Sequence, residues 1–196
     1  MVAGGRGARF GGPKQFERLE GRRVVDWALA ASRSVAAGVV LVVPADHLGD
    51  EAPAADVVVA GGATRSASVR AGLAAVPVDA GVIVVHDAAR PFARPALFEA
   101  VVAAVRAGAD GAVPGVPVTD TIKRVVAGQV VATLDRDELV AVQTPQAFAA
   151  AALRRAHAEA PEATDDAALV EAAGGRVVVV AGDPANAKIT RRADLG

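Results

Sequence analysis

The chain of 196 residues contains no cysteine, few aromatic residues and no long run of uncharged hydrophobic residues. Without cysteine it can form neither disulfides nor thiolate metal sites, and it has no cysteine nucleophile. No apolar stretch reaches the roughly 20 residues of a membrane-spanning helix, and no basic-then-apolar leader precedes a cleavage site. The formal net charge of −1 favours neither nucleic acid nor an anionic membrane as a partner. We therefore expect a soluble, cytoplasmic protein.

Lysine is the other scarce residue. Of 21 basic residues only three are lysine, at Lys14, Lys123 and Lys188, and the rest are arginine. Lysine is a compact, mobile point charge that can follow a phosphate as its geometry changes, whereas arginine presents a rigid fork. Each lysine is therefore a candidate for a phosphate-handling site, with chance usage as the alternative.

The hydrophobic residues, 53% of the chain, are mostly alanine and valine, and they fall into alternating runs. Val-rich runs at residues 38–43, 56–59, 81–87 and 176–180 are typical of buried parallel strands. Helix candidates alternate with them at residues 24–36, 66–76, 95–107, 149–160 and 165–173. This order predicts a doubly wound, mostly parallel α/β sheet. We expect a single domain over residues 1–196.

One stretch interrupts the alternation. Residues 121–126 and 130–134 read as two strands around a short turn, Ala127-Gly128-Gln129, and therefore predict a β-hairpin. Such an insertion, spanning about residues 117–140, is a candidate arm that covers a site or pairs with another subunit.

Two glycine-rich segments are candidates for binding a nucleotide. In the first, Gly4, Gly5 and Gly7 precede Lys14, with two arginines between them, so backbone amides and cations can surround a triphosphate. It matches neither the P-loop nor the dinucleotide-binding fingerprint, and a loop without function is the alternative. The second, residues 61–68, follows a strand and opens a helix, where amides favour an anion or a polar base edge.

Charged residues follow the third predicted strand, in His86-Asp87-Ala88-Ala89-Arg90-Pro91. The carboxyl ends of strands are where open α/β sheets bind ligands. Asp87 there can hold Mg²⁺ together with nucleotide phosphates, and Arg90 can grip a phosphate. The alternative is an ion pair at the surface, and His86 reads as structural. In Thr164-Asp165-Asp166, an N-cap is the favoured interpretation.

These segments, in this order, resemble the cytidylyltransferases that make 4-diphosphocytidyl-2-C-methyl-D-erythritol in the non-mevalonate isoprenoid pathway. The resemblance covers almost the whole chain. Its motifs are Ala3-Gly4-Gly5-Arg6-Gly7-Ala8-Arg9, Pro13-Lys14-Gln15, Gly61-Gly62 with Arg65 and Ser68, His86-Asp87-Ala88-Ala89-Arg90-Pro91, Asp120-Thr121-Ile122-Lys123-Arg124, Asp135-Arg136, Gln143-Thr144-Pro145-Gln146, Thr164-Asp165-Asp166 and Asn186-Ala187-Lys188-Ile189-Thr190-Arg191.

The resemblance implies a Rossmann-like nucleotidyltransferase fold and assigns roles to particular residues. It places Arg9 and Lys14 at the α-phosphate of CTP during transfer, and Arg136 and Lys188 at the acceptor, methylerythritol phosphate. It places CTP against Ala3, Gly4, Gly5, Gly7, Gly62, Ala63 and Ser68, and lines the acceptor side with Asp87, Arg90 and Thr121. It also implies Mg²⁺, and a homodimer joined by the hairpin arm, so that Thr121 and Arg136 serve the neighbouring subunit's site.

The chain departs from the family pattern in three places. Gly4 stands where the loop usually has a second alanine, and Ala63 stands where an acidic residue usually follows the glycine pair, so a ribose or base contact is in doubt. The first strand and the last helix are short. Two alternatives remain open: a ribitol-5-phosphate cytidylyltransferase, which shares most motifs, and a non-catalytic nucleotide-binding relative.

Overall fold

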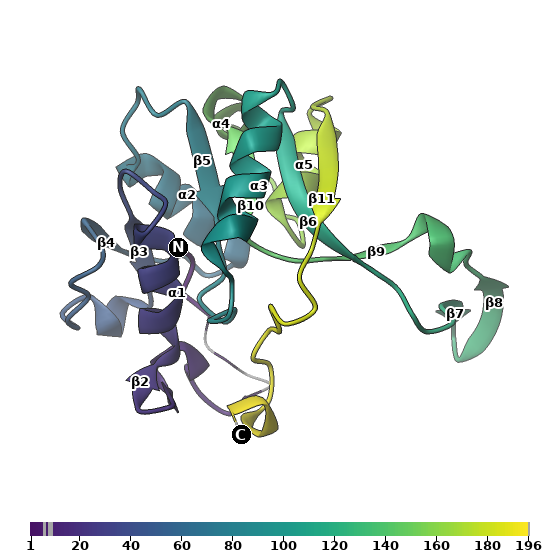
Figure 1. Ribbon diagram of the computed structural model, residues 1–196, viewed down its shortest axis with the longest axis horizontal. Helices are drawn as coiled ribbons and strands as arrows, with labels where there is room; N and C mark the ends of the chain where they lie inside the picture. The colour runs from purple at the N-terminus through teal and green to yellow at the C-terminus, as the bar shows by residue number, and fades with distance from the viewer. Residues whose placement is uncertain (6, 8–9, 196) are drawn as a thin grey trace.

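The four Val-rich runs form β3 (Val40–Val43), β4 (Val57–Ala60), β5 (Val82–Val85) and β11 (Val177–Ala181), as predicted. The computed structural model describes residues 1–5, 7 and 10–195, and the predicted Arg9 site lies outside them. Within the described residues, the strands build a central sheet with helices on both faces and an arm that extends from one side (Figure 1).

The sheet is assembled around a short N-terminal segment. Val2 bridges Val42 of β3 and Asp87 after β5, in parallel with both, and so joins the β3–β4 pair to the larger sheet. That sheet has the order β11–β6–β10–β5, with β6 at Gly111–Pro117 and β10 at Gln146–Ala149. The doubly wound α/β class is therefore confirmed, with β11 parallel to β6 and β3 parallel to β4.

Three strands of the larger sheet, β6, β9 (Val140–Val142) and β10, were missing from the sequence prediction. β10 runs antiparallel to both β5 and β6, and β9 pairs antiparallel with the far end of β6. The strand β6 contains Pro114 and Pro117, which argue against a central strand when the sequence is read alone. β10, with the sequence QAFA, has no β-branched residue. Partner strands, rather than local propensity, therefore fix these segments.

Helices pack in two layers around this sheet. On one face lie α1 (Val24–Arg33) and α3 (Pro95–Arg106), where Val101 and Val105 pack against Ala112 and Ala147 of the sheet. The other face carries α2 (Arg65–Ala75), α4 (Ala150–Ala156) and α5 (Asp166–Ala172), which share a core around Phe148. Burying one such large side chain contributes roughly 1.5–3 kcal/mol to the stability of the fold. The helices on both faces therefore hold the sheet, and with it the ends of its strands, in place.

The predicted helices are all present, but their ends differ. α4 begins after Ala149, because Ala149 pairs with Val82 in the sheet, and it ends at Ala156, before residue 160 takes a positive φ. The helix predicted over residues 165–173 begins one residue later, because Asp165 is its N-cap and accepts a hydrogen bond from the amide of Ala168. A short 3-10 helix, Arg192–Leu195, closes the described chain.

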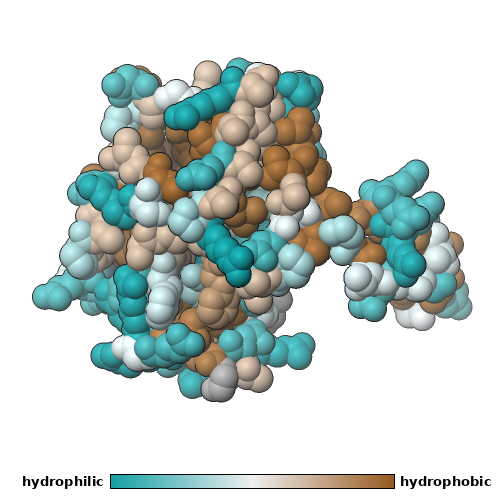
Figure 2. Space-filling view, viewed as in Figure 1, coloured by the Kyte–Doolittle hydropathy of each residue, from teal (hydrophilic) through white to brown (hydrophobic). Residues whose placement is uncertain are grey.

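The predicted hairpin forms the arm. β7 (Lys123–Val126) and β8 (Gln129–Thr133) pair around Ala127 and Gly128, whose φ angles of 48° and 81° suit the tight turn of a two-residue hairpin. The arm extends away from the rest of the molecule (Figure 1), and all four residues of β7 are exposed. Brown, apolar atoms lie along the neck that joins it to the sheet (Figure 2).

Candidate active site

A cleft of about 410 Å³ lies where the N-terminal segment, β4, β5 and β11 are followed by loops. Segments far apart in the sequence meet there. Its lining residues are Val2, Ala3, Gly4, Gly5, Gly7, Phe10, Lys14, Gln15, Gly62, Ala63, Thr64, Arg65, Ser68, Asp87, Ala88, Ala89, Lys188 and Thr190. The carboxyl-end location is the one at which doubly wound sheets bind their ligands.

The side chain of Gln15 holds the backbone of the N-terminal glycine segment. This side chain is 3% exposed and donates hydrogen bonds to the carbonyl oxygens of Ala3 (2.5 Å) and Gly5 (2.9 Å). Gly7 has a φ of +63°, which glycine adopts without strain. Lys14 Nζ donates to the carbonyl oxygen of Ile189, so the glycine segment is tied to the chain beside Lys188.

The second glycine segment joins β4 to α2. A Cβ at Gly62 would lie 2.5 Å from the Cβ of Ala67, so a larger residue would displace the start of the helix. Thr64 is the N-cap of α2 and accepts from the amide of Ala67, and Ser68 Oγ donates to the Thr64 carbonyl oxygen at 2.9 Å. These contacts fix the turn that forms one wall of the cleft.

Asp87 lies between two cations. Its Oδ2 is 2.6 Å from Lys188 Nζ, and its Oδ1 is 3.6 Å from Arg65 Nη2. Burial alone would raise the pKa of the Asp87 carboxyl, but Lys188 and Arg65 outweigh it and hold this pKa below its ordinary value. The carboxylate is therefore ionised at neutral pH and pairs with two cations at the cleft.

The imidazole of His86 is structural, as the sequence indicated. Its Nδ1 contacts Thr144 Oγ1 at 3.1 Å and its Nε2 contacts the Arg90 carbonyl oxygen at 3.2 Å, while Thr144 Oγ1 accepts from the Asp87 amide. Burial lowers the pKa of His86 to about 3, so the ring is neutral. We infer that His86 fixes the turn that carries Asp87.

Most of the residues that the sequence predicted for the site line this cleft. Ten of them line it: Ala3, Gly4, Gly5, Gly7, Lys14, Gly62, Ala63, Ser68, Asp87 and Lys188. The remaining three described residues, Arg90, Thr121 and Arg136, do not line it. Their predicted roles stay predictions.

Arg90 and Arg136 have other partners within this chain. Arg90 donates to the carbonyl oxygen of Asn186 at 2.7 Å, and burial lowers its guanidinium pKa. Arg136 lies on the arm, is exposed and donates to the Thr119 carbonyl oxygen at 2.8 Å. Thr121 is exposed on the same arm. In this structure the arm residues therefore lie outside the cleft of their own chain.

Several lining residues were given no site role by the sequence, above all Arg65. Its guanidinium is 25% exposed and connects Asp87 to Asp166. Burial alone would lower the pKa of Arg65, but Asp166 and Asp87 raise it above its ordinary value. Its position one residue after the N-cap of α2 was the available signal, since the first turn of that helix faces the cleft.

At the cleft, one carboxylate is available to bind a divalent cation. Among the described residues, no group of three or more His, Asp or Glu side chains is arranged to hold a metal. Asp87 is the only acidic side chain that lines the described cleft. Mg²⁺ commonly binds one or two carboxylates together with substrate phosphates, so this donor set fits a cation held mainly by a triphosphate.

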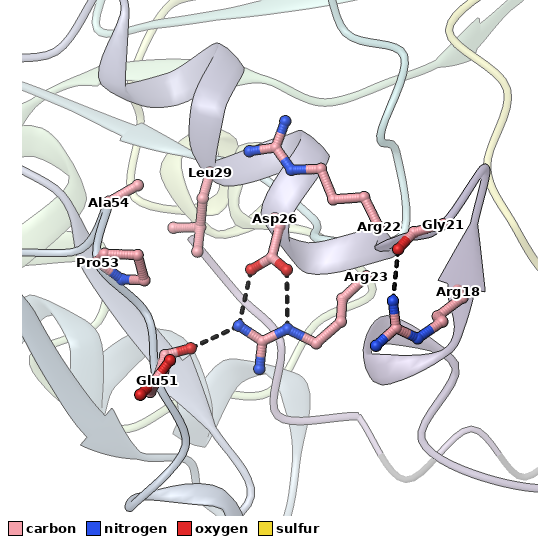
Figure 3. Close-up of a pocket in the computed structure, with 9 residues that line it drawn as sticks. All are labelled: Arg18, Gly21, Arg22, Arg23, Asp26, Leu29, Glu51, Pro53 and Ala54. Carbon is pink, nitrogen blue, oxygen red and sulfur yellow. Dashed lines mark hydrogen bonds and ion pairs between the residues drawn. The ribbon is translucent and has the colours of Figure 1, made fainter.

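A second hollow, of about 460 Å³, lies between the β1–β2 hairpin and α1 (Figure 3). β1 is Arg18–Leu19 and β2 is Arg22–Arg23. Its arginines have partners already: Arg23 forms two 2.8 Å bonds to Asp26, Arg18 donates to the Gly21 carbonyl oxygen, and Arg22 lies over the Trp27 ring. It collects none of the predicted site residues, so we do not assign the active site to it.

The glycine segments, the cations and the doubly wound sheet together define a nucleotide-binding enzyme of the nucleotidyltransferase class. The family of 2-C-methyl-D-erythritol 4-phosphate cytidylyltransferases matches residues 1–196. The chain belongs to this family. In the described part of the chain, no helix has both the length and the apolar character needed to cross a membrane.

Individual relatives agree with this family. The chain is 49% identical to the 2-C-methyl-D-erythritol 4-phosphate cytidylyltransferase of Nocardia farcinica, covering 100% of this chain and 89% of the relative. It is 46% identical to the bifunctional enzyme IspD/IspF of Clavibacter michiganensis, of which it spans only 52%. The crystal structure of the cytidylyltransferase from Thermus thermophilus superposes with a TM-score of 0.82 at 39% identity, covering 99% of this chain and 93% of that one.

Proposed function

We propose that this chain transfers the cytidylyl group of CTP to 2-C-methyl-D-erythritol 4-phosphate, forming 4-diphosphocytidyl-2-C-methyl-D-erythritol and pyrophosphate. The observation that carries the proposal is the meeting of Lys14, Asp87 and Lys188 with two glycine segments in one cleft. Family membership supports the same reaction.

The reaction needs positioning and charge neutralisation more than it needs a protein nucleophile. A phosphate oxygen of the acceptor attacks the α-phosphorus of CTP, a new P–O bond forms, and the bond to the β-phosphate breaks to release pyrophosphate. The attacking oxygen is already ionised at neutral pH, so a strong base is unnecessary. Both partners are anions, and cations fixed at the reacting phosphates lower the barrier.

Lys14 and Lys188 supply these cations from opposite ends of the sequence. We assign Lys14, with Arg9, to the charge that develops on the α-phosphate, and Lys188 to the acceptor phosphate. Lys188 is 41% exposed and paired with Asp87, so its amine is poised beside the cleft and can turn to a phosphate when substrate binds. Asp87 holds this amine near the site.

The nucleotide is assigned to the two glycine segments. Amides of Gly4, Gly5 and Gly7 can approach the triphosphate without side chains in the way. Gly62, Ala63 and Ser68 form the other wall, beside the start of α2. We place the ribose and base against this second wall, and the acceptor against Asp87.

We also propose that Mg²⁺ accompanies CTP. The single carboxylate Asp87 would hold it together with phosphate oxygens, and the ion would neutralise charge on the leaving pyrophosphate when bound. Lys188, which pairs with Asp87 in this structure, would then serve the acceptor phosphate.

A homodimer is proposed to complete the site. The arm carries exposed apolar side chains, including Val125 (53% exposed), Val126 (59%) and Val130 (61%). Pairing with the arm of a second copy would bury them and would bring Thr121 and Arg136 to the neighbouring cleft. We propose a cytoplasmic location, where CTP is present.

The proposed function is tested by supplying CTP with each of two acceptors, 2-C-methyl-D-erythritol 4-phosphate and ribitol 5-phosphate, and measuring pyrophosphate release. We expect release with the first acceptor, and none without an acceptor or with UTP in place of CTP. A preference for ribitol 5-phosphate would assign the chain to that sibling activity. Binding of CTP without pyrophosphate release with either acceptor would identify a non-catalytic relative.

A further inference from the structure

A buried carboxylate lies directly behind the cleft wall. The side chain of Asp166, the first residue of α5, is 0% exposed, although nothing in the proposed chemistry uses it. It is held by Arg65 Nη1, at 2.8 Å from its Oδ2, and by His157 Nε2, at 2.9 Å from its Oδ1. A carboxylate is placed this deeply only when charged or polar donors compensate the lost hydration.

His157 is arranged to hold this carboxylate. Its side chain is 3% exposed, its Nε2 faces Asp166, and its Nδ1 is buried with no hydrogen-bond partner among the described residues. A proton on Nδ1 would be buried without an acceptor, whereas a bare Nδ1 lone pair costs less. A proton on Nε2 therefore fits the geometry, with His157 as donor to Asp166.

Arg65 connects this pair to the cleft. One end of its guanidinium is fixed by Asp166, and Nη2 at the other end lies 3.6 Å from Asp87, which in turn pairs with Lys188. Charges alternate along the row Asp166, Arg65, Asp87, Lys188. Removing the first charge would leave Arg65 with Asp87 as its nearest anionic partner, so the guanidinium would shift toward Asp87 and compete with Lys188 for it.

We propose that Asp166, oriented by His157, is a positioning residue that fixes Arg65 and thereby sets the place of Asp87 and Lys188 at the acceptor side of the cleft. This inference rests on the proposed function for the identity of the acceptor. It gives Arg65 and Asp166 a role in acceptor binding beyond stabilising the fold.

The kinetic test compares Asp166→Asn with Glu162→Gln in the full chain. Glu162 pairs with Arg70 of the same helix α2 at 2.8 Å, and neither residue lines the cleft. Its side chain is 51% exposed, so this variant removes a surface link to that helix and leaves the buried one intact. We expect Asp166→Asn to raise the acceptor KM roughly tenfold with kcat within about threefold, because uniform binding is lost. Glu162→Gln should leave both within about twofold.

A merely structural role would give a different result. It would lower kcat in proportion to the loss of folded protein and leave the acceptor KM unchanged, and that outcome overturns the inference. A double-mutant cycle with Arg65→Gln adds a second criterion: if Asp166 acts through Arg65, Asp166→Asn changes the KM of the Arg65→Gln enzyme little. Full, additive effects in that background also overturn it.

NMR of the Arg65 guanidinium tests the positioning without turnover. In the parent protein the two Nη groups are held by different carboxylates, so we expect separate, slowly exchanging resonances that merge in Asp166→Asn and persist in Glu162→Gln. Unchanged Arg65 resonances in Asp166→Asn would overturn the inference. If the resonances merge while neither acceptor releases pyrophosphate, the proposed function fails and the positioning of Arg65 stands.

Discussion

The cleft and the arm both carry residues that are predicted to act in the same reaction, but they differ in how their side chains are held. In the cleft, the Asp87 side chain is 13% exposed and contacts Lys188 and Arg65, with a buried layer of polar side chains behind it. On the arm, Arg136 and most of β7 and β8 are exposed. One chain therefore fixes the geometry of its own cleft, whereas the arm needs a partner to fix where its side chains act.

The lysines give the largest expected effect, and they separate the two regions. We predict that Lys14→Ala and Lys188→Ala each lower kcat by about a hundredfold or more, because each removes a cation from the reacting phosphates. Lys123→Ala is the matched control: Lys123 lies on the arm and its Nζ contacts Thr133 Oγ1 at 2.6 Å. The kcat of this variant should stay within about threefold of the parent value. Steady-state pyrophosphate release measures the kcat of all three variants. Equal losses would show that the cleft lysines and the arm lysine do not differ in their roles.

Complementation tests whether the arm serves a neighbouring cleft. Arg136→Ala and Lys14→Ala should each be nearly inactive as homodimers. A mixed dimer has one site in which Lys14 and Arg136 are both intact, so refolding the two variants together should restore about a quarter of the parent activity. Activity that stays at the level of the separate variants would show that Arg136 acts in its own chain or not at all.

The sequence predicted the cleft better than it predicted the sheet. Glycine segments and charged residues after strands are local signals, so Gly62, Asp87 and Lys188 could be assigned before their proximity was known. The strand β10 could not be predicted, because it depends on pairing with β5 and β6. Arg65 was given no role, although it follows the N-cap of α2, because its ion pairs with Asp87 and Asp166 join residues far apart in the sequence.

The stability of the protein should fall in acid because His86, which lies behind the cleft, is buried. The pKa of His86 is lowered from 6.5 to about 3 by burial, so between these values the unfolded chain binds one more proton than the folded chain. The free energy of unfolding should therefore fall as the pH drops through this window, by at most about 1.4 kcal/mol per pH unit from this group.

Replacing His86 isolates that contribution. Denaturant unfolding of the parent and of His86→Gln, measured between about pH 6.5 and pH 4.5, should show a shallower pH dependence in the variant, because all other titrations are shared. Identical slopes would show that His86 is protonated in the folded protein. The arm, which has no buried histidine among its described residues, should not contribute to this difference.

The smallest predicted effect concerns the nucleotide wall. Ala63 stands where the family resemblance places an acidic residue, and it is exposed at the cleft. We predict that Ala63→Asp lowers the KM for CTP by about threefold, which corresponds to one added hydrogen bond to the ribose or base. The acceptor KM should not change. A higher KM for CTP would show that added negative charge near the triphosphate outweighs the new contact.

The place where CTP binds tests the central claim most directly. A crystal structure of the protein with CTP should show the triphosphate between the segment of Gly4, Gly5 and Gly7 and the turn at Gly62, with Lys14 and Lys188 within hydrogen-bond reach of its phosphates or of a bound acceptor. A nucleotide bound elsewhere, for example in the hollow between the β1–β2 hairpin and α1, with the cleft free of phosphate, would contradict the account.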